Sequence, residues 1–161
     1  MDFNQIRYHS QRVYSLCEYF IVGMSFSEKH SQILLDAAEL HDMCKLDEKH
    51  GLCTRHEVAA ANEIEENHLA KHRLRVADVV LNHKGKFSPE ERNWEMAAIL
   101  RLCDKLDKFD KGDLDAEQSC ETNFKKIESW CRKRYLHHTV EFIQIECIYR
   151  TLLELKKQNI L

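Results

Sequence analysis

Apolar residues recur three and four positions apart near the start of the chain, the spacing that one face of an α-helix produces. A first helix is therefore predicted from Asp2 to about Val22, closed by Gly23. Ser27 is expected to cap a second helix that runs to His41. The apolar positions of these two helices are Ile6, Val13, Leu16, Cys17, Phe20, Ile33, Leu34, Ala37, Ala38 and Leu40.

Two capping-box patterns predict where later helices begin. Thr54 is followed three positions later by Glu57, a T-x-x-E sequence that would open a third helix. Ser88 precedes a proline and is followed three positions later by Glu91, so a further helix is expected to begin there. Each pattern would satisfy backbone N–H groups that the first turn of a helix leaves without partners.

The segment between these two starts has no glycine or proline until Gly85. One unbroken helix over residues 54–83 would be too long for a compact domain, so a break is expected near Asn67 or His68. The second half then forms a strongly apolar helix ending around His83. Residues 43–53, which precede this region, are polar and are predicted to form a loop.

Composition supports a helical protein of ordinary domain size. The chain has 161 residues, 43% hydrophobic and 32% charged, with four glycines and one proline, which favours long helices over a many-stranded sheet. We predict an all-α, single-domain bundle of about six or seven helices over residues 1–161. Its core would be 1–112, and C-terminal helices in 113–161, the last capped by Thr139, would pack on that core.

Charge and cysteine usage narrow the setting. The net charge of −3 gives no general attraction for nucleic acid, and no apolar run is long enough to suggest a membrane span. The N-terminus lacks the layout of a secretory signal. Seven cysteines without a CxxC pair are expected to be reduced, buried thiols. A cytoplasmic protein is predicted, with neither membrane nor nucleic acid as a partner.

Three positions carry candidate chemistry on apolar stripes or helix ends. His9 shares the inward face of the first helix, where a core histidine bonded to a carbonyl is the simpler interpretation. The adjacent His41 and Asp42 offer a nitrogen and an oxygen ligand for a divalent cation. Asp104 lies on the buried stripe of a later helix, where a salt bridge is the alternative, because a buried carboxylate needs compensation. Asp107 shares that face.

With His56 and His83, these residues form the order H…HD…H…H…D along a helical chain. This order resembles the HD-domain superfamily of metal-dependent phosphohydrolases over about residues 1–112. The segments that carry the resemblance are HSQRV, LLDAAELHDMCK, RHEVAAANEI, VVLNHKG and ILRLCDKLDKFD.

The resemblance implies metal ligands and a catalytic pair. A first metal ion would be held by His9, His41, Asp42 and Asp104. A second would use His56 and His83, with Asp42 bridging both ions. Asp42 and Lys45 would be catalytic, and Lys45 would bind substrate phosphate. Arg12, three positions after His9, and Lys84, next to His83, are further candidates by position for binding phosphate, with ordinary surface side chains as the alternative. The chain departs from the family pattern in two places: the family usually has glycine where this chain has Cys44, and the loop from Asp42 to His56 is fairly short.

The implied activity is hydrolysis of a phosphomonoester or phosphodiester of a nucleotide or similar small metabolite by a metal-activated hydroxide. One or two divalent ions would be required, and Mn, Fe, Co, Zn and Mg all suit these ligand types. The alternatives are a di-iron oxygenase on the same scaffold and a non-catalytic metal- or nucleotide-binding regulatory module. Homo-oligomer formation through the apolar last helix stays open.

Two further features have simple explanations. His68 and His72 have an i, i+4 spacing that can bind zinc, but they adjoin the expected helix break. The charge-rich segment KKIESWCRKR is most simply an exposed helix face, with a nucleic-acid patch as the alternative.

Overall fold

A computed structural model describes residues 2–109 and 114–161, which are helical or irregular and contain no strand. The all-α prediction is confirmed, and seven of the described α-helices are longer than the five-residue α3. None of the helices in these two ranges combines the length and apolar character that a membrane span requires. The elements are α1 Phe3–Met24, α2 Glu28–Leu40, α3 Lys45–Lys49, α4 His56–Glu66, α5 Arg73–Leu81, η1 Glu91–Asn93, α6 Trp94–Asp107, α7 Leu114–Lys133 and α8 Val140–Lys157.

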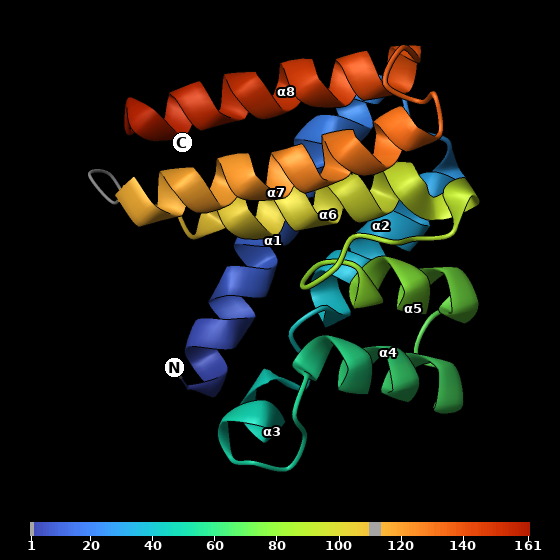
Figure 1. The fold of residues 1–161 in the computed structure, drawn as a ribbon. Helices are drawn as coiled ribbons and strands as arrows, with labels where there is room; N and C mark the ends of the chain where they lie inside the picture. The colour runs from blue at the N-terminus through green and yellow to red at the C-terminus, as the bar shows by residue number, and fades with distance from the viewer. Residues whose placement is uncertain (1, 110–113) are drawn as a thin grey trace.

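Helix α6 is the centre of the packing. Its side chains from Met96 to Asp104 are all buried, because α1, α2 and α5 pack against it, and α7 and α8 cover another side. Figure 1 shows α6, α7 and α8 stacked, with α4 and α5 lying side by side below them and α3 at the end of the molecule away from α8. A helix buried on all sides can carry a polar side chain only where partners surround that group.

Helix starts test the capping predictions one by one. Ser27 accepts from the His30 N–H and Thr139 accepts from the Phe142 N–H, so both of these caps are confirmed. The predicted break near Asn67 and His68 is also confirmed, because α4 ends at Glu66 and His68 has a φ of 52°.

The capping box at Thr54 is wrong. Helix α4 begins at His56, and the Glu48 Oε2 atom of α3 accepts from the His56 N–H at 2.6 Å. Glu57 is engaged elsewhere, since its Oε1 atom accepts from Arg55 Nε at 2.8 Å. A side chain from the preceding helix therefore accepts from the first backbone N–H of α4. Residues 43–53 are correspondingly not a simple loop, because they contain α3.

The helix start at Ser88 is also wrong. The Ser88 N–H donates to Asn82 Oδ1 at 2.7 Å, and the Glu90 N–H donates to Asp78 Oδ2 at 2.9 Å. These bonds hold the backbone extended at Glu90, so α6 begins only at Trp94, after the turn η1.

Gly23 does not close the first helix, which continues to Met24 and ends with Ser25 in the left-handed region at a φ of 52°. Gly23 instead allows a close approach of α8. A Cβ atom added there would lie 2.7 Å from Ile148 Cδ1, well inside normal contact distance. The helix end predicted at Gly23 is therefore wrong, and this glycine serves the packing of α8 on α1.

Candidate metal centre

All six candidate ligand residues are buried, at 4% exposure or less, and their side chains meet at one place. They come from separate elements: one from the middle of α1, two from the end of α2, one from the start of α4, one from just after α5 and one from α6. In that order they are His9, His41, Asp42, His56, His83 and Asp104.

The first group of potential ligands is His9, His41, Asp42 and Asp104. His9 Nε2 lies 2.8 Å from Asp104 Oδ1 and 3.4 Å from Asp42 Oδ2. His41 Nε2 lies 3.4 Å from each of these two oxygens. The two Nε2 atoms are 3.3 Å apart. Two nitrogens and two carboxylate oxygens therefore face a common point.

The second group is Asp42, His56 and His83. Asp42 Oδ1 lies 3.2 Å from His56 Nε2 and 3.5 Å from His83 Nε2. The two histidine Nε2 atoms are 3.3 Å apart. Because Oδ1 faces this group and Oδ2 faces the first, Asp42 is the side chain that the two groups share.

Backbone carbonyls fix two of the four histidines. His41 Nδ1 donates to the Ala38 carbonyl at 2.7 Å, and His83 Nδ1 donates to the Val80 carbonyl at 2.5 Å. A carbonyl can only accept, so Nδ1 carries the proton and each neutral ring keeps a lone pair on Nε2.

Carboxylates fix the other two histidines. His9 Nδ1 donates to Asp107 Oδ2 at 2.6 Å, and His56 Nδ1 donates to Glu48 Oε2 at 3.0 Å. Hydrogen bonding at the far nitrogen is the arrangement that orients metal-binding imidazoles and raises their basicity. All four rings thus turn Nε2 toward the Asp42 carboxylate.

Asp42 tests whether a metal ion suits this arrangement. Both of its carboxylate oxygens are buried and neither has a hydrogen bond of acceptable geometry. A buried, uncompensated carboxylate is costly, and a divalent cation among four imidazole nitrogens would compensate it. The donor set of imidazole and carboxylate suits Mn, Fe, Co, Zn or Mg and does not select among them. These residues could therefore hold one or two metal ions.

Electrostatics differ among the histidines. Burial lowers the pKa of His9, but the hydrogen bonds to Asp104 and Asp107 outweigh burial and raise that pKa to about 9. Burial lowers the pKa of His83, which has no outer carboxylate. Burial raises the pKa of Asp104, but the neighbouring imidazoles of His41 and His9 hold that pKa well below its usual value.

The sequence did not predict the two carboxylates that hold histidine rings, Asp107 and Glu48. Asp107 holds His9 and also accepts from Arg12 Nε at 2.8 Å. Its spacing of three from Asp104 and the matching spacing of Arg12 from His9 were the available signals. Glu48 had none, because it reaches His56 only through the turn of α3.

Glu48, His56 and Glu57 form a third cluster of potential ligand atoms. Glu57 is buried, and its Oε2 atom has no hydrogen-bond partner. His68 and His72 belong to none of the potential metal-holding groups found in the described parts of the chain.

The three candidate phosphate-binding cations are placed differently. Lys45 Nζ lies 3.6 Å from Asp42 Oδ2 at the edge of the centre. Arg12 is engaged by Asp107, although more than half of its side chain is exposed. Lys84 is exposed beside His83. The hydrogen bond from the His56 backbone N–H is the main cause that lowers the pKa of Glu48, and the positive charge of Lys84 lowers this pKa further.

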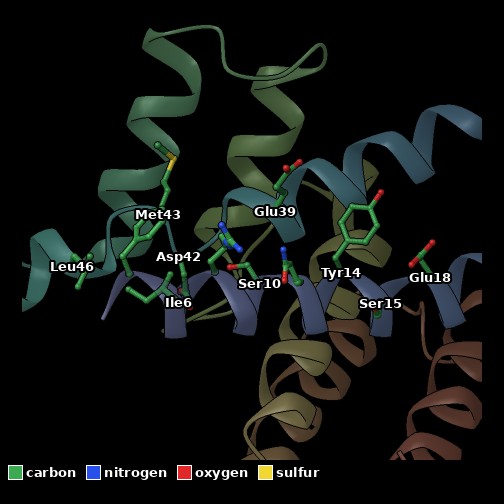
Figure 2. Close-up of a pocket in the computed structure, with 12 residues that line it drawn as sticks. Ile6, Ser10, Tyr14, Ser15, Glu18, Glu39, Asp42, Met43 and Leu46 are labelled. Carbon is green, nitrogen blue, oxygen red and sulfur yellow. The ribbon is translucent and has the colours of Figure 1, made fainter. Parts of the chain in front are cut away.

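A groove of about 770 Å³ opens beside Asp42. In Figure 2 it runs along α1 from Ile6, past Ser10 and Tyr14, to Glu18. Its other side includes Glu39 of α2, Met43 in the segment after α2, and Leu46 of α3. The segment after His83 does not line this groove, because Lys86, Phe87 and Ser88 line a different hollow.

The fold and the centre together define a class, that of helical proteins with a buried histidine–aspartate cluster that could bind metal. A family model described as the HD domain matches residues 6–110, which is more than half of the chain. The chain therefore belongs to the HD domain family, as the resemblance predicted, and this family consists generally of metal-dependent phosphohydrolases. No curated protein and no solved structure matches the chain.

Proposed function

We propose that this protein is a metal-dependent phosphohydrolase that cleaves a phosphomonoester or phosphodiester of a nucleotide or similar small metabolite. One observation carries the proposal: four histidines, each held at Nδ1 by an outer acceptor, turn Nε2 toward the buried carboxylate of Asp42, which accepts no hydrogen bond of acceptable geometry. A cluster of this kind has no evident use in packing, because burying several ionisable groups together costs free energy.

The proposed ligands are those of the two groups that share Asp42. His9, His41, Asp42 and Asp104 would hold the first ion. His56 and His83 would hold a second with Asp42. When bound, such ions supply a water molecule of lowered pKa and a Lewis acid for phosphoryl oxygen.

The remaining steps belong to side chains around the centre. Lys45, close to Asp42, would neutralise charge that develops on the phosphoryl oxygens. Arg12 and Lys84 are weaker candidates for binding phosphate, because Arg12 is engaged by Asp107 and Lys84 is exposed. Asp107 and Glu48 would keep the His9 and His56 rings in the tautomer that ligation requires.

The groove beside Asp42 supports a substrate with an organic part of some length. From Ser10 to Glu18, α1 rises by roughly 12 Å at 1.5 Å per residue. The near end is apolar around Ile6 and Met43, and the far end carries the Tyr14 hydroxyl with Glu18 and Glu39. Hydroxyl or amino groups of a nucleoside-sized substrate would find acceptors there.

The cysteines bear on the proposed cellular setting, and the helix contacts bear on the proposed domain organisation. All seven cysteines are free, and five of them are buried, which supports the proposal that the protein acts in the reducing cytoplasm. Helices α7 and α8 contact α6, and α8 also contacts α1, which supports a single domain over residues 1–161.

The decisive experiment combines metal analysis of the purified protein with a phosphatase screen over nucleotides and sugar phosphates. Asp42→Ala is expected to lose both bound metal and turnover while retaining its far-UV circular dichroism, because Asp42 is shared by both groups. Asp47→Ala, an exposed carboxylate of α3, is the matched control. Normal activity of Asp42→Ala would refute the site, and oxygen uptake without phosphate release would point to an oxygenase.

A further inference from the structure

A second hollow, of about 630 Å³, lies on another part of the surface and belongs to no part of the candidate metal centre. One wall is the segment between α5 and η1, and the other is one face of α7 with the residue that follows it. The lining residues are Lys86, Phe87, Ser88, Thr122, Lys125, Lys126, Ser129, Trp130, Lys133 and Arg134.

Five of these residues are cations, and none of the lining residues is acidic. Across the described residues, none of the lysine ammonium groups in this hollow forms an ion pair with a carboxylate. Lys125 and Lys133 are eight positions apart on α7, or roughly 12 Å along its axis. In a chain with a net charge of −3, so many unpaired cations around one hollow make a local positive field that attracts anions.

Trp130 provides a second, independent observation. Its side chain is nine-tenths buried in the wall of the hollow, yet its Nε1–H is buried without a hydrogen-bond partner. An indole N–H can only donate, so the missing partner must be an acceptor. The Arg134 guanidinium lies 4.0 Å from the centre of the Trp130 ring, which adds positive charge at the same spot. A donor without a partner, beside a guanidinium and in the wall of a hollow lined by lysines, is matched by an anionic oxygen.

The aromatic rings decide between kinds of anion. Phe87 and Trp130 are buried and pack edge to face on each other, with ring centres 5.5 Å apart. Because both rings are at most 6% exposed, neither offers an open face on which a base of single-stranded nucleic acid could stack. What the hollow offers is ammonium groups, hydroxyls of Thr122 and Ser129, and one indole donor. These groups recognise phosphate oxygens, and their spread fits several phosphates in a row.

We propose that this hollow binds a chain of linked phosphate groups, either free or as part of a nucleotide, at a site separate from the candidate metal centre. The ligand would bridge the Lys86 segment and α7. Lys86 lies three residues after His83, so an occupant would contact the same short segment that leads away from the metal centre.

The test uses the indole N–H of Trp130 as its own reporter. The chain has two tryptophans, Trp94 and Trp130, so a ¹H–¹⁵N spectrum of the full-length protein contains two indole signals. Titration with inorganic tripolyphosphate at constant ionic strength is expected to shift the Trp130 signal to saturation and to leave Trp94 unchanged. The double variant Lys125→Glu/Lys133→Glu is expected to bind at least about tenfold more weakly, since two charge-assisted contacts are lost.

Matched arms distinguish the alternatives. Lys29→Glu/Lys71→Glu makes the same change in net charge away from the hollow and should bind tripolyphosphate as the unchanged protein does. A nucleoside triphosphate that binds equally supports recognition of the phosphate chain alone, and one that binds more tightly supports a nucleotide. The proposal is overturned if Trp130 does not respond, if both double variants weaken binding equally, or if a ten-nucleotide RNA binds the same residues more tightly than tripolyphosphate.

Discussion

The two groups that meet at Asp42 are built on different kinds of support. His9 and Asp104 lie within α1 and α6, and His41 caps the end of α2; these three helices pack on one another, and α6 is buried from Met96 to Asp104. His56 and His83 instead lie at the first residue of α4 and just beyond the last residue of α5. The first group therefore depends on the core of the protein, and the second depends on helix ends and the short α3.

The outer acceptors show the same contrast. Asp107, which holds His9, has a side chain only 2% exposed and is itself paired with Arg12. Glu48, which holds His56, is 30% exposed and sits on the five-residue α3. Local opening costs least where little apolar surface is buried. We therefore expect the second group to form less rigidly and to lose an ion more readily.

Removing one ligand from each group should have the largest and most unequal effects. His9→Ala is expected to lose the first ion and to lower kcat/KM by roughly 10²–10³-fold, the range for loss of a pre-organised electrostatic group. His83→Ala should retain the first ion and lose only the second. Metal-to-protein ratios by mass spectrometry check this, with circular dichroism as the control for folding. Equal metal loss in both variants would contradict the division into two groups.

Removing the outer acceptors should weaken metal binding without deleting a ligand. Asp107→Asn and Glu48→Ala are each expected to lower the affinity of their own group by about 10–100-fold, the usual cost of losing such a partner. Competition with a metal-sensitive chelator dye measures both affinities. Asp47→Ala removes a charge from the same α3 helix and should leave affinity unchanged; a similar loss in that variant would mean that net charge, not the bond to His56, is responsible.

Removing the cations should affect substrate more than metal. Lys45→Ala is expected to lower kcat/KM by roughly 10²-fold with full metal retention, because Lys45 lies beside Asp42, where its ammonium group would neutralise charge on a bound phosphate. Arg12→Ala and Lys84→Ala should cost less, since one is engaged by Asp107 and the other is exposed. Steady-state kinetics with the substrate found in the screen check the order, and a larger effect of Lys84 would reverse it.

The smallest effect is expected at Thr54, which was predicted to cap a helix but does not cap α4. Thr54→Ala should change the free energy of unfolding by less than about 0.5 kcal/mol, as for an ordinary surface position. Thr139→Ala, which removes a real cap, should cost about 1 kcal/mol. Urea unfolding followed by circular dichroism compares the two. A cost at Thr54 as large as that at Thr139 would show that α4 begins earlier in solution.

Local patterns predicted the parts of this fold that local interactions determine. Ser27 and Thr139 cap the helices expected of them, and apolar spacing placed His9 and Asp104 on buried faces. The meeting of His56 and His83 with Asp42 was foreseen only through the family resemblance, because nothing in the spacing relates residues on different helices.

The failures have the opposite character. Thr54 and Ser88 carried good local signals, but Glu48 and Asn82 supplied partners from elsewhere and moved each helix start. The groove along α1 was not predicted either, because Ser10 and Tyr14 have the spacing of an ordinary polar helix face. Tertiary contacts overrode the sequence pattern at each of these places.

Arg101 has a consequence for how the protein can be divided. This arginine is 1% exposed on α6, and it donates to the Asn82 carbonyl, the Gly85 carbonyl and the Asn123 side chain of α7. The first two acceptors flank His83, whereas Asn123 lies beyond residue 110, where the match to the family ends. A recombinant fragment that ends at the family boundary would remove one hydrogen-bond partner of this guanidinium and expose it to solvent. Work on the histidine cluster should therefore use the full-length chain, not a fragment that ends at residue 110.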